Sequence, residues 1–337
     1  MRFEGLYVAG AASWLPPAQP VADAVAAGVF TQRLAASTDI ETVAVAEAES
    51  PPEMAARAVD RVLDATGVGS EDLDLILYAA TYYQGQDLWP PASYVQRVAV
   101  GNRCPAIEVR QMSNGGMAAL ELGAAFLSAS AERGGVLLAT GDRFAPPGFD
   151  RWLTDPGTVY GDGGTALVLS RRPGRLRLTC LATVADAELE GMHRGTDPFA
   201  SEPFTVRRPI SLGACKDAFV ADVGLSYCTT RLAAGQQEVL KRTLAEADLQ
   251  LSDIDWFVLP HLGRRRLQQT YLRPLGIDPQ RTTWAWSRTV GHLGAGDQIA
   301  GLAHLLDSGR LRPGQRCLLM GVGAGFVWTN AVLEVWS

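Results

Sequence analysis

The chain has 337 residues, of which 47% are hydrophobic and 20% charged, and its formal net charge is −6 at pH 7. Such a composition is typical of a globular protein with one large or two modest domains and a substantial core. The negative charge argues against non-specific nucleic-acid binding, which requires a basic surface. No apolar run approaches the roughly 18 residues of a membrane-spanning helix, so we expect no membrane association.

The first ten residues, MRFEGLYVAG, carry Arg2 and Glu4 ahead of a short apolar stretch. They are typical of a first strand rather than a signal peptide, and we expect a cytoplasmic protein. The cysteines are odd in number and widely spaced, which predicts neither a disulfide framework nor a metal site. They are Cys104, Cys180, Cys215, Cys228 and Cys317, and the last is expected to be a buried strand residue.

Further along, the order helix, turn and apolar strand recurs in a way that indicates an internal duplication. Residues 51–81 match 236–263, residues 115–142 match 296–325, and the strand segment 160–170 matches 323–336. Continuous apolar strands such as GVLLAT and RCLLMGV are typical of sheets covered by helices on both faces. We therefore predict an α/β protein with two pseudo-symmetric halves, residues 1–170 and 171–337, that pack as one body.

The stretch at residues 194–219 lies between the repeated units and is irregular and rich in Pro, Gly and Ser. It also carries Phe199, Phe204 and Phe219, which a disordered linker would seldom contain. We therefore predict that this insertion lies over a pocket.

Four stretches resemble, in order, the landmarks of the ketoacyl-acyl-carrier-protein synthase III branch of the thiolase superfamily. They are residues 88–123, 159–170, 257–267 and 291–328. The resemblance implies the five-layered α/β/α/β/α thiolase fold, usually as a homodimer, with an active site where the two halves meet.

The family's nucleophile is a cysteine at the start of a buried helix, where the positive end of the helix dipole favours the thiolate. Here Ser113 occupies that position, within EVRQMSNGGM at residues 108–117. A hydroxyl is far less acidic than a thiol, so a nucleophilic serine requires a neighbouring general base. The alternative is that Ser113 only caps the helix that follows.

Two histidines and one aspartate are candidates to activate Ser113. His261, in LPHLG, matches the family's catalytic histidine, and His292 stands where the family has an asparagine. Asp297 follows five residues later, at the start of a predicted helix. We predict a triad of Ser113, His292 and Asp297, as in serine hydrolases, with His261 as a further catalytic residue and the alternative base. Alternatively, Asp297 only complements the helix dipole, or His292 is a loop residue without a role.

The resemblance also implies an oxyanion hole, formed by the backbone N–H groups of Ser113 and of Ala324 in the late glycine-rich turn. His193, in the irregular region, is a minor candidate for the pocket wall, and His304 is expected to be structural. The glycine-rich stretches YGDGG and GVGAG lack the spacing of nucleotide-binding loops, and no cofactor is predicted.

The site is similar to that of the priming ketosynthase-like acyltransferases of daunorubicin-type polyketide pathways, which pair a Cys or Ser nucleophile with His and Asp. This likeness implies a short acyl-CoA such as propionyl-CoA as the substrate. A histidine coupled to a carboxylate suits proton transfer better than the decarboxylation that precedes condensation. However, the family's CoA-binding pattern is not recognisable, and its adenine-stacking arginine falls near Pro156. Two alternatives follow: CoA binds differently here, or the donor is a carrier-protein thioester.

Arg264, Arg265 and Arg266 begin a predicted helix beside His261, where the family docks its acidic carrier protein. We predict carrier docking there, with a solvated basic face as the alternative. Three functions are compatible with the sequence. A priming acyltransferase that transfers the acyl group to a carrier protein or a small-molecule acceptor is favoured over a condensing synthase and over a non-catalytic synthase partner.

Overall fold

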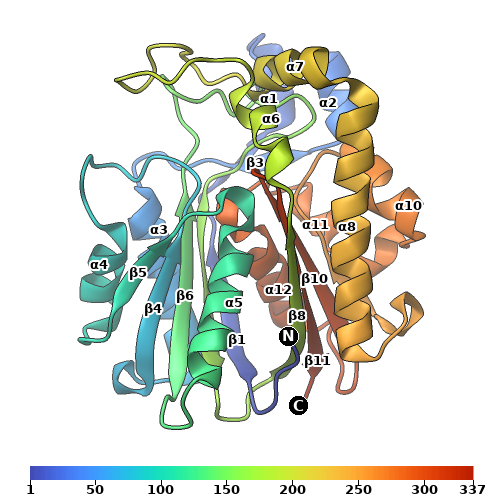
Figure 1. The fold of residues 1–337 in the computed structure, drawn as a ribbon. Helices are drawn as coiled ribbons and strands as arrows, with labels where there is room; N and C mark the ends of the chain where they lie inside the picture. The colour runs from blue at the N-terminus through green and yellow to red at the C-terminus, as the bar shows by residue number, and fades with distance from the viewer. Residues whose placement is uncertain (337) are drawn as a thin grey trace.

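A computed structural model of the chain describes residues 1–336 and contains one mixed sheet of nine strands (Figure 1). In spatial order its strands are β5 (Ala106–Val109), β4 (Leu73–Ala79), β6 (Gly135–Asp142), β7 (Gly163–Ser170), β1 (Tyr7–Trp14), β8 (Leu176–Ala185), β11 (Val327–Val335), β10 (Arg316–Gly323) and β9 (Trp256–Val258). A separate small sheet pairs β2 (Ala18–Pro20) with β3 (Thr42–Ala44).

Four long helices organise the molecule around this sheet: α3 (Pro51–Thr66), α5 (Gly115–Ser128), α8 (Leu225–Ala247) and α12 (Asp297–Asp307). The insertion forms α7 (Leu212–Val223). Shorter helices complete the chain: α1 (Val21–Ala26), α2 (Gln32–Thr38), α4 (Pro91–Val95), α6 (Gly191–Arg194), α9 (Arg264–Leu267), α10 (Arg273–Leu275) and α11 (Trp284–Ser287).

The strand pairings repeat the duplication that the sequence predicts. In the first half β4 runs parallel to β6, and β6 pairs antiparallel with β7. In the second half β9 runs parallel to β10, and β10 pairs antiparallel with β11. In the first half α3 precedes β4 and α5 precedes β6. In the second half α8 precedes β9 and α12 precedes β10.

The two halves are joined through a single pair of strands, because β1 pairs with β8 at Tyr7 opposite Arg177 and at Val8 opposite Leu176. The hydrogen-bonded sheet is thus continuous across the molecule. The division at residues 170 and 171 falls in the turn between β7 and β8 and stays a prediction, since both halves contribute to one sheet.

Strands of the first half and strands of the second half lie on opposite sides of α5 and α12, so the elements form five layers, as in the thiolase fold (Figure 1). Helix α3 packs against β1, β6 and β7 on one outer side, and α8 packs against β8 and β11 on the other. Helices α5 and α12 contact each other in the middle layer. Strands β6 and β7 are buried along their whole length, which explains why their sequences are apolar without alternation.

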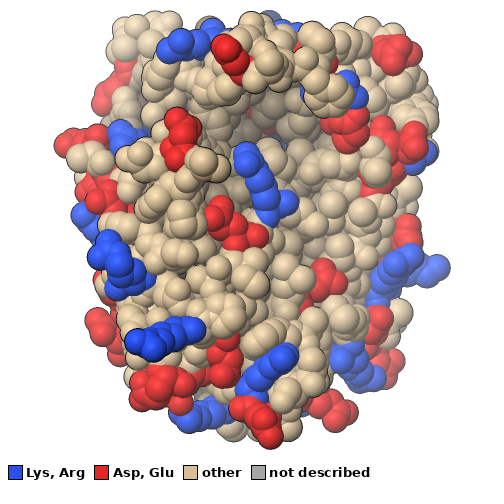
Figure 2. All heavy atoms as spheres, turned by 60° about the vertical axis from the view of Figure 1, so that its left-hand side comes forward, with Lys and Arg blue, Asp and Glu red and all other residues tan. Residues whose placement is uncertain are grey.

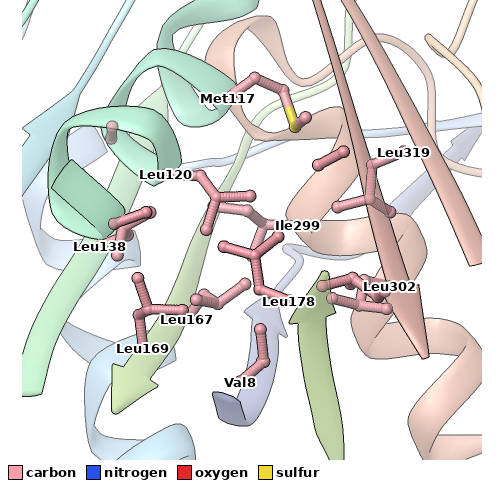
Figure 3. Close-up of a cluster of buried hydrophobic side chains, with 14 of the residues drawn as sticks. Val8, Met117, Leu120, Leu138, Leu167, Leu169, Leu178, Ile299, Leu302 and Leu319 are labelled. Carbon is pink, nitrogen blue, oxygen red and sulfur yellow. The ribbon is translucent and has the colours of Figure 1, made fainter. Parts of the chain in front are cut away.

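The middle layer is held by the largest cluster of buried apolar side chains (Figure 3). Met117 and Leu120 of α5 and Ile299 and Leu302 of α12 are at most 2% exposed. Burying a side chain of this size contributes roughly 1.5–3 kcal/mol each. This packing fixes α5 and α12 side by side, so the residues at their N-terminal ends are brought together.

The insertion at residues 194–219 differs in part from the expectation. It ends in α7, which begins at Leu212, and α8 then starts at Leu225, earlier than the repeat predicts. Phe219 joins a buried cluster with Leu189 and Met192. Phe199 and Phe204 are 93% and 43% exposed, so these two rings do not belong to the core. No helix within residues 1–336 is long and apolar enough to cross a membrane.

Candidate active site

Ser113 lies in a short 3-10 turn, Met112–Asn114, between β5 and α5. Met112 has φ of 49°, in the left-handed region, so the chain turns sharply just before the serine. The residue at the N-cap of α5 is Asn114, which makes no side-chain capping hydrogen bond. Ser113 therefore does not cap the helix, and its hydroxyl is directed elsewhere.

His292 lies in a loop before α12 and is held through its backbone. Its N–H donates to the carbonyl of Val159 at 2.8 Å, and its own carbonyl accepts from the N–H of Gly161 at 3.0 Å. The ring of Tyr160 meets the imidazole edge-on, with 5.1 Å between centroids. The stretch before β7, in the first half, thus positions a histidine of the second half.

The three predicted triad residues are in direct contact. Ser113 Oγ lies 2.8 Å from His292 Nε2, and His292 Nδ1 lies 2.6 Å from Asp297 Oδ2. His292 is 4% exposed and Asp297 is 1% exposed. With Nδ1–H donated to the carboxylate, Nε2 is free to accept the serine proton, which is the arrangement of a general base.

Asp297 and His292 each stabilise the charged form of the other. Burial would raise the pKa of Asp297, but the neighbouring His261 and His292 rings lower it to about 2. Burial would lower the pKa of His292, but the Asp297 carboxylate outweighs it and holds the pKa above its ordinary value. Asp297 also accepts N–H bonds from Leu293 and His261, at 2.8 Å each, so it does more than complement the dipole of α12.

His261 lies on the far side of the same carboxylate. Its Nδ1 is 3.0 Å from the carbonyl of Gly291 and 3.4 Å from Asp297 Oδ1, and its ring is fully buried beside Trp286. Burial lowers its pKa. The residues that line the cavity described below include His292 but not His261. His292 is therefore the histidine that contacts Ser113, and His261 contacts Asp297.

Close contact between the halves sets this geometry. A Cβ at Gly116, in the first turn of α5, would lie 2.5 Å from the carbonyl oxygen of Ala295, which no real contact allows. Ala295 N–H also donates to the buried Asp142 at 3.1 Å, and the same carboxylate accepts N–H groups of Thr81 and Tyr82. Burial raises the pKa of Asp142 to about 6. Glycine at 116 thus allows the turn before α12 to approach α5, the helix that follows Ser113.

Ser113 and His292 open onto a cavity of about 520 Å³, a size common for ligand pockets. The apolar part of its wall includes Met192, Leu232, Phe326 and Trp328. The polar part includes Tyr160, His193, Gln236 and Gln269. Figure 2 shows a surface hollowed near the top of the molecule, the height at which α6 and α7 lie in Figure 1, with charges of both signs dispersed over this face.

A cluster of charged residues that the sequence did not reveal lines the same cavity. Asp155 accepts from Lys216 Nζ at 2.6 Å and from Arg266 Nη1 at 2.9 Å. Burial would raise the pKa of Asp155, but these two cations hold it well below its usual range. The cluster joins the loop before β7, the insertion and α9, three segments that no sequence motif connects.

Arg266 is the one member of the predicted docking group that also lines the cavity, and its part in carrier docking stays a prediction. Its guanidinium is engaged with Asp155, Thr158 and the carbonyl of Pro156 on the cavity wall. Arg264 and Arg265 are exposed, and Arg264 pairs with Asp39 at 3.0 Å. The sequence did not reveal the contact with Asp155, because helical spacing does not show which neighbour a long side chain meets.

The remaining candidates differ in their relation to the cavity. Ala324 and Ser113 both line it, which is compatible with the predicted oxyanion hole. His193 lines it too, edge-on to Phe326, and burial together with Lys216 lowers its pKa to about 4. His304 stacks on Trp286 with 4.6 Å between ring centroids, away from the cavity.

The cysteines take no part in this site. All five are free, and Cys317 is buried in β10 as predicted. Among residues 1–336, no group of three or more His, Cys, Asp or Glu side chains is placed to hold a metal ion.

Comparisons with known proteins identify the family. A family model for the C-terminal part of 3-oxoacyl-[acyl-carrier-protein] synthase III matches residues 244–335. Among solved structures, the acyltransferase ChlB3 is similar over 98% of both chains, with 35% sequence identity and a TM-score of 0.94. The chain belongs to the 3-oxoacyl-[acyl-carrier-protein] synthase III family. It is an acyl-transferring enzyme with the thiolase fold.

More distant members of this family match the whole chain. The beta-ketoacyl-[acyl-carrier-protein] synthase III of Neisseria meningitidis is 26% identical over 340 residues, 97% of this chain and 98% of the relative. That of Vesicomyosocius okutanii is 23% identical over 334 residues, with the same coverage. The crystal structure of 3-oxoacyl-(acyl carrier protein) synthase III from Xanthomonas oryzae has 17% identity and a TM-score of 0.79. The similarity covers 99% of this chain and 100% of that one, and it supports the fold alone.

Proposed function

We propose that this enzyme accepts a short acyl group, such as propionyl, from acyl-CoA or an acyl carrier protein onto Ser113 and transfers it to a carrier protein or another acceptor. The observation that carries the proposal is the chain of contacts from Ser113 through His292 to Asp297. A serine at this position needs a base, and the base is present at hydrogen-bond distance with an orienting carboxylate behind it. The 35% identity to a protein named as an acyltransferase favours transfer.

The proposed reaction has two steps, and His292 accepts and returns the proton in both. His292 Nε2 takes the proton of Ser113 as Oγ attacks the thioester carbonyl, and the same proton leaves with the departing thiolate. An acceptor thiol or hydroxyl then gives its proton to His292, attacks the ester, and Ser113 regains its hydrogen. The N–H groups of Ser113 and Ala324 would stabilise the oxyanion in both steps. The thioester supplies the activation, so no cofactor is required.

Partners and context are part of the proposal. Arg264 and Arg265 offer exposed cations for docking an acidic carrier protein. β5 is an edge strand with Ile107 50% exposed, which supports a homodimer formed through this edge. The resemblance to priming acyltransferases suggests that the transfer is a starter or tailoring step in polyketide assembly.

Intact-mass measurement tests the proposal most directly. Incubation with propionyl-CoA or another short acyl-CoA should add one acyl mass to the protein, and Ser113→Ala should show none. His304→Ala is a suitable control, because His304 lies away from the cavity. If neither CoA-bound nor carrier-bound donors leave an adduct, the chain is better explained as a non-catalytic partner of a synthase.

A condensing synthase is the second candidate, since the whole-chain relatives at 23% and 26% identity carry that name. In this function malonyl-carrier would lose CO₂ and attack the acyl group on Ser113. His292 replaces the family's asparagine, which removes one of the two neutral donors that support decarboxylation. Release of CO₂ and a 3-ketoacyl product by the unmodified protein would favour this second function.

A further inference from the structure

Lys216 is the one lysine among residues 1–336 that lines the cavity. The chain contains two lysines, and Lys216 lines the same cavity as Ser113, with its side chain 20% exposed. Within residues 1–336 its only hydrogen-bond partner is Asp155, at 2.6 Å. An ammonium group has three N–H donors. Two donors of Lys216 are therefore uncommitted at a site where a ligand can reach them.

The neighbouring arginine is differently placed. Arg266 donates from Nη1 to Asp155 and Thr158 and from Nη2 to Asp155 and the Pro156 carbonyl. Its terminal nitrogens are thus engaged within the protein. Asp155 compensates one of the two cations, and the cluster keeps one positive charge. A partly buried uncompensated charge is costly unless an anion meets it.

We propose that Lys216 recognises a carboxylate on the acyl group, so that the preferred donors are thioesters of dicarboxylic acids. This inference rests on the proposed function, since the acyl group must reach Ser113. The apolar wall around Leu232, Phe326 and Trp328 would contact the carbon chain, while the free donors of Lys216 bind its terminal carboxylate. A short neutral acyl group such as propionyl would leave those donors without a partner, so it should reach Ser113 more slowly than a short dicarboxylic acyl group.

The test uses donors that differ in this carboxylate. Succinyl and butyryl thioesters of N-acetylcysteamine have the same number of acyl carbons, and neither carries a phosphate. Acylation of Ser113 is followed by intact mass over time. We expect the succinyl donor to react about tenfold faster or more, because a hydrogen bond to a charged group commonly contributes a factor of about ten to a hundred. Equal rates for the two donors would overturn the inference.

Variants assign the preference to Lys216. In Lys216→Met the ratio of succinyl to butyryl rates should fall about ten- to a hundredfold, and Lys216→Arg should retain part of it. Asp155 keeps Arg266 as a partner in both variants, so its carboxylate is not left unpaired. Lys241→Met, which removes the other and exposed lysine, is the matched control and should keep the ratio. An unchanged ratio in Lys216→Met would contradict the assignment.

Two further measurements distinguish carboxylate recognition from phosphate binding and from failure of the proposed function. If Lys216→Met slows succinyl-CoA and butyryl-CoA equally but spares the N-acetylcysteamine thioesters, the lysine binds a CoA phosphate and the inference is wrong. If no donor acylates the protein, the proposed function fails. The inference about Lys216 is then tested by binding of the two thioesters to the Ser113→Ala variant. Isothermal titration should then show tighter binding of the succinyl than of the butyryl thioester, and the difference should be lost in Ser113→Ala with Lys216→Met.

Discussion

Helices α5 and α12 begin alike but carry different groups at their starts. A 3-10 turn precedes each, Met112–Asn114 for α5 and Gly294–Gly296 for α12. The turn before α5 contains Ser113, while Asp297 is the first residue of α12. The duplicated fold thus places the proposed nucleophile at one helix start and the proposed orienting acid at the other.

This difference shows what a helix N-terminus can and cannot do. Its partial positive charge stabilises a group that is already acidic, and Asp297 is ionised there with its pKa lowered to about 2 by the two histidines that outweigh its burial. The same effect is too weak to ionise a serine hydroxyl. In the proposed function Ser113 therefore becomes a nucleophile only through His292, which connects the two helix starts.

Removal of that connection should have the largest effect. In His292→Ala, Ser113 loses its only base, and acylation should slow by about 10³-fold or more, as in other serine-based sites. Mass-detected acylation over time measures the rate. His261→Ala should cost less, because His261 contacts the acid and not the serine. A larger loss in His261→Ala would show that the base has been assigned to the wrong histidine.

Neutralising the acid should have a smaller effect with a distinct signature. Asp297→Asn should slow acylation about a hundredfold, since His292 keeps its place but loses its charged partner. Only neutral His292 can accept the proton, so the rate should rise with pH through the pKa of His292, which Asp297 raises. Without the carboxylate, the inflection of the rate profile should move to lower pH. An unchanged inflection would mean that another group limits the rate.

The smallest expected change concerns condensation. Ser113→Cys with His292→Asn restores the residue types of the family and turns the base into a neutral donor. Production of 3-ketoacyl product from malonyl-carrier should then rise severalfold from a low level, because a thioester is more electrophilic than an ester. Product is measured by mass spectrometry, with Ser113→Cys alone as the control. A high condensing rate in the unmodified protein would contradict the distinction between transfer and condensation.

Ser113 and His292 could be proposed from the sequence because the family resemblance places them where the family has its nucleophile and its asparagine. Asp297 could be added because it begins the next helix, five residues after His292. The recurring order of apolar strands and helices predicts sheets covered by helices, while the five layers follow from the family resemblance. What joins these patterns into one site is the packing of α5 against α12.

The charged cluster could not be predicted in this way. Asp155, Lys216 and Arg266 lie 61 and 50 residues apart, in a loop, an insertion and a short helix. Their contacts depend on how the insertion folds back over the cavity. Periodicity predicts which face of a helix is apolar but not the tertiary partner of a long polar side chain. For that reason the sequence did not reveal that Arg266 contacts Asp155.

The insertion has one more consequence, for how such enzymes diversify. The triad is held by the repeated core, where Gly116 and Ala295 meet with no space for a methyl group. Lys216 comes from α7, in a segment that contributes no strand to the sheet. Mutations in this segment can reshape the cavity without moving Ser113 or His292. On the proposed function, evolution can therefore change the acyl substrate of the enzyme while its chemistry stays the same.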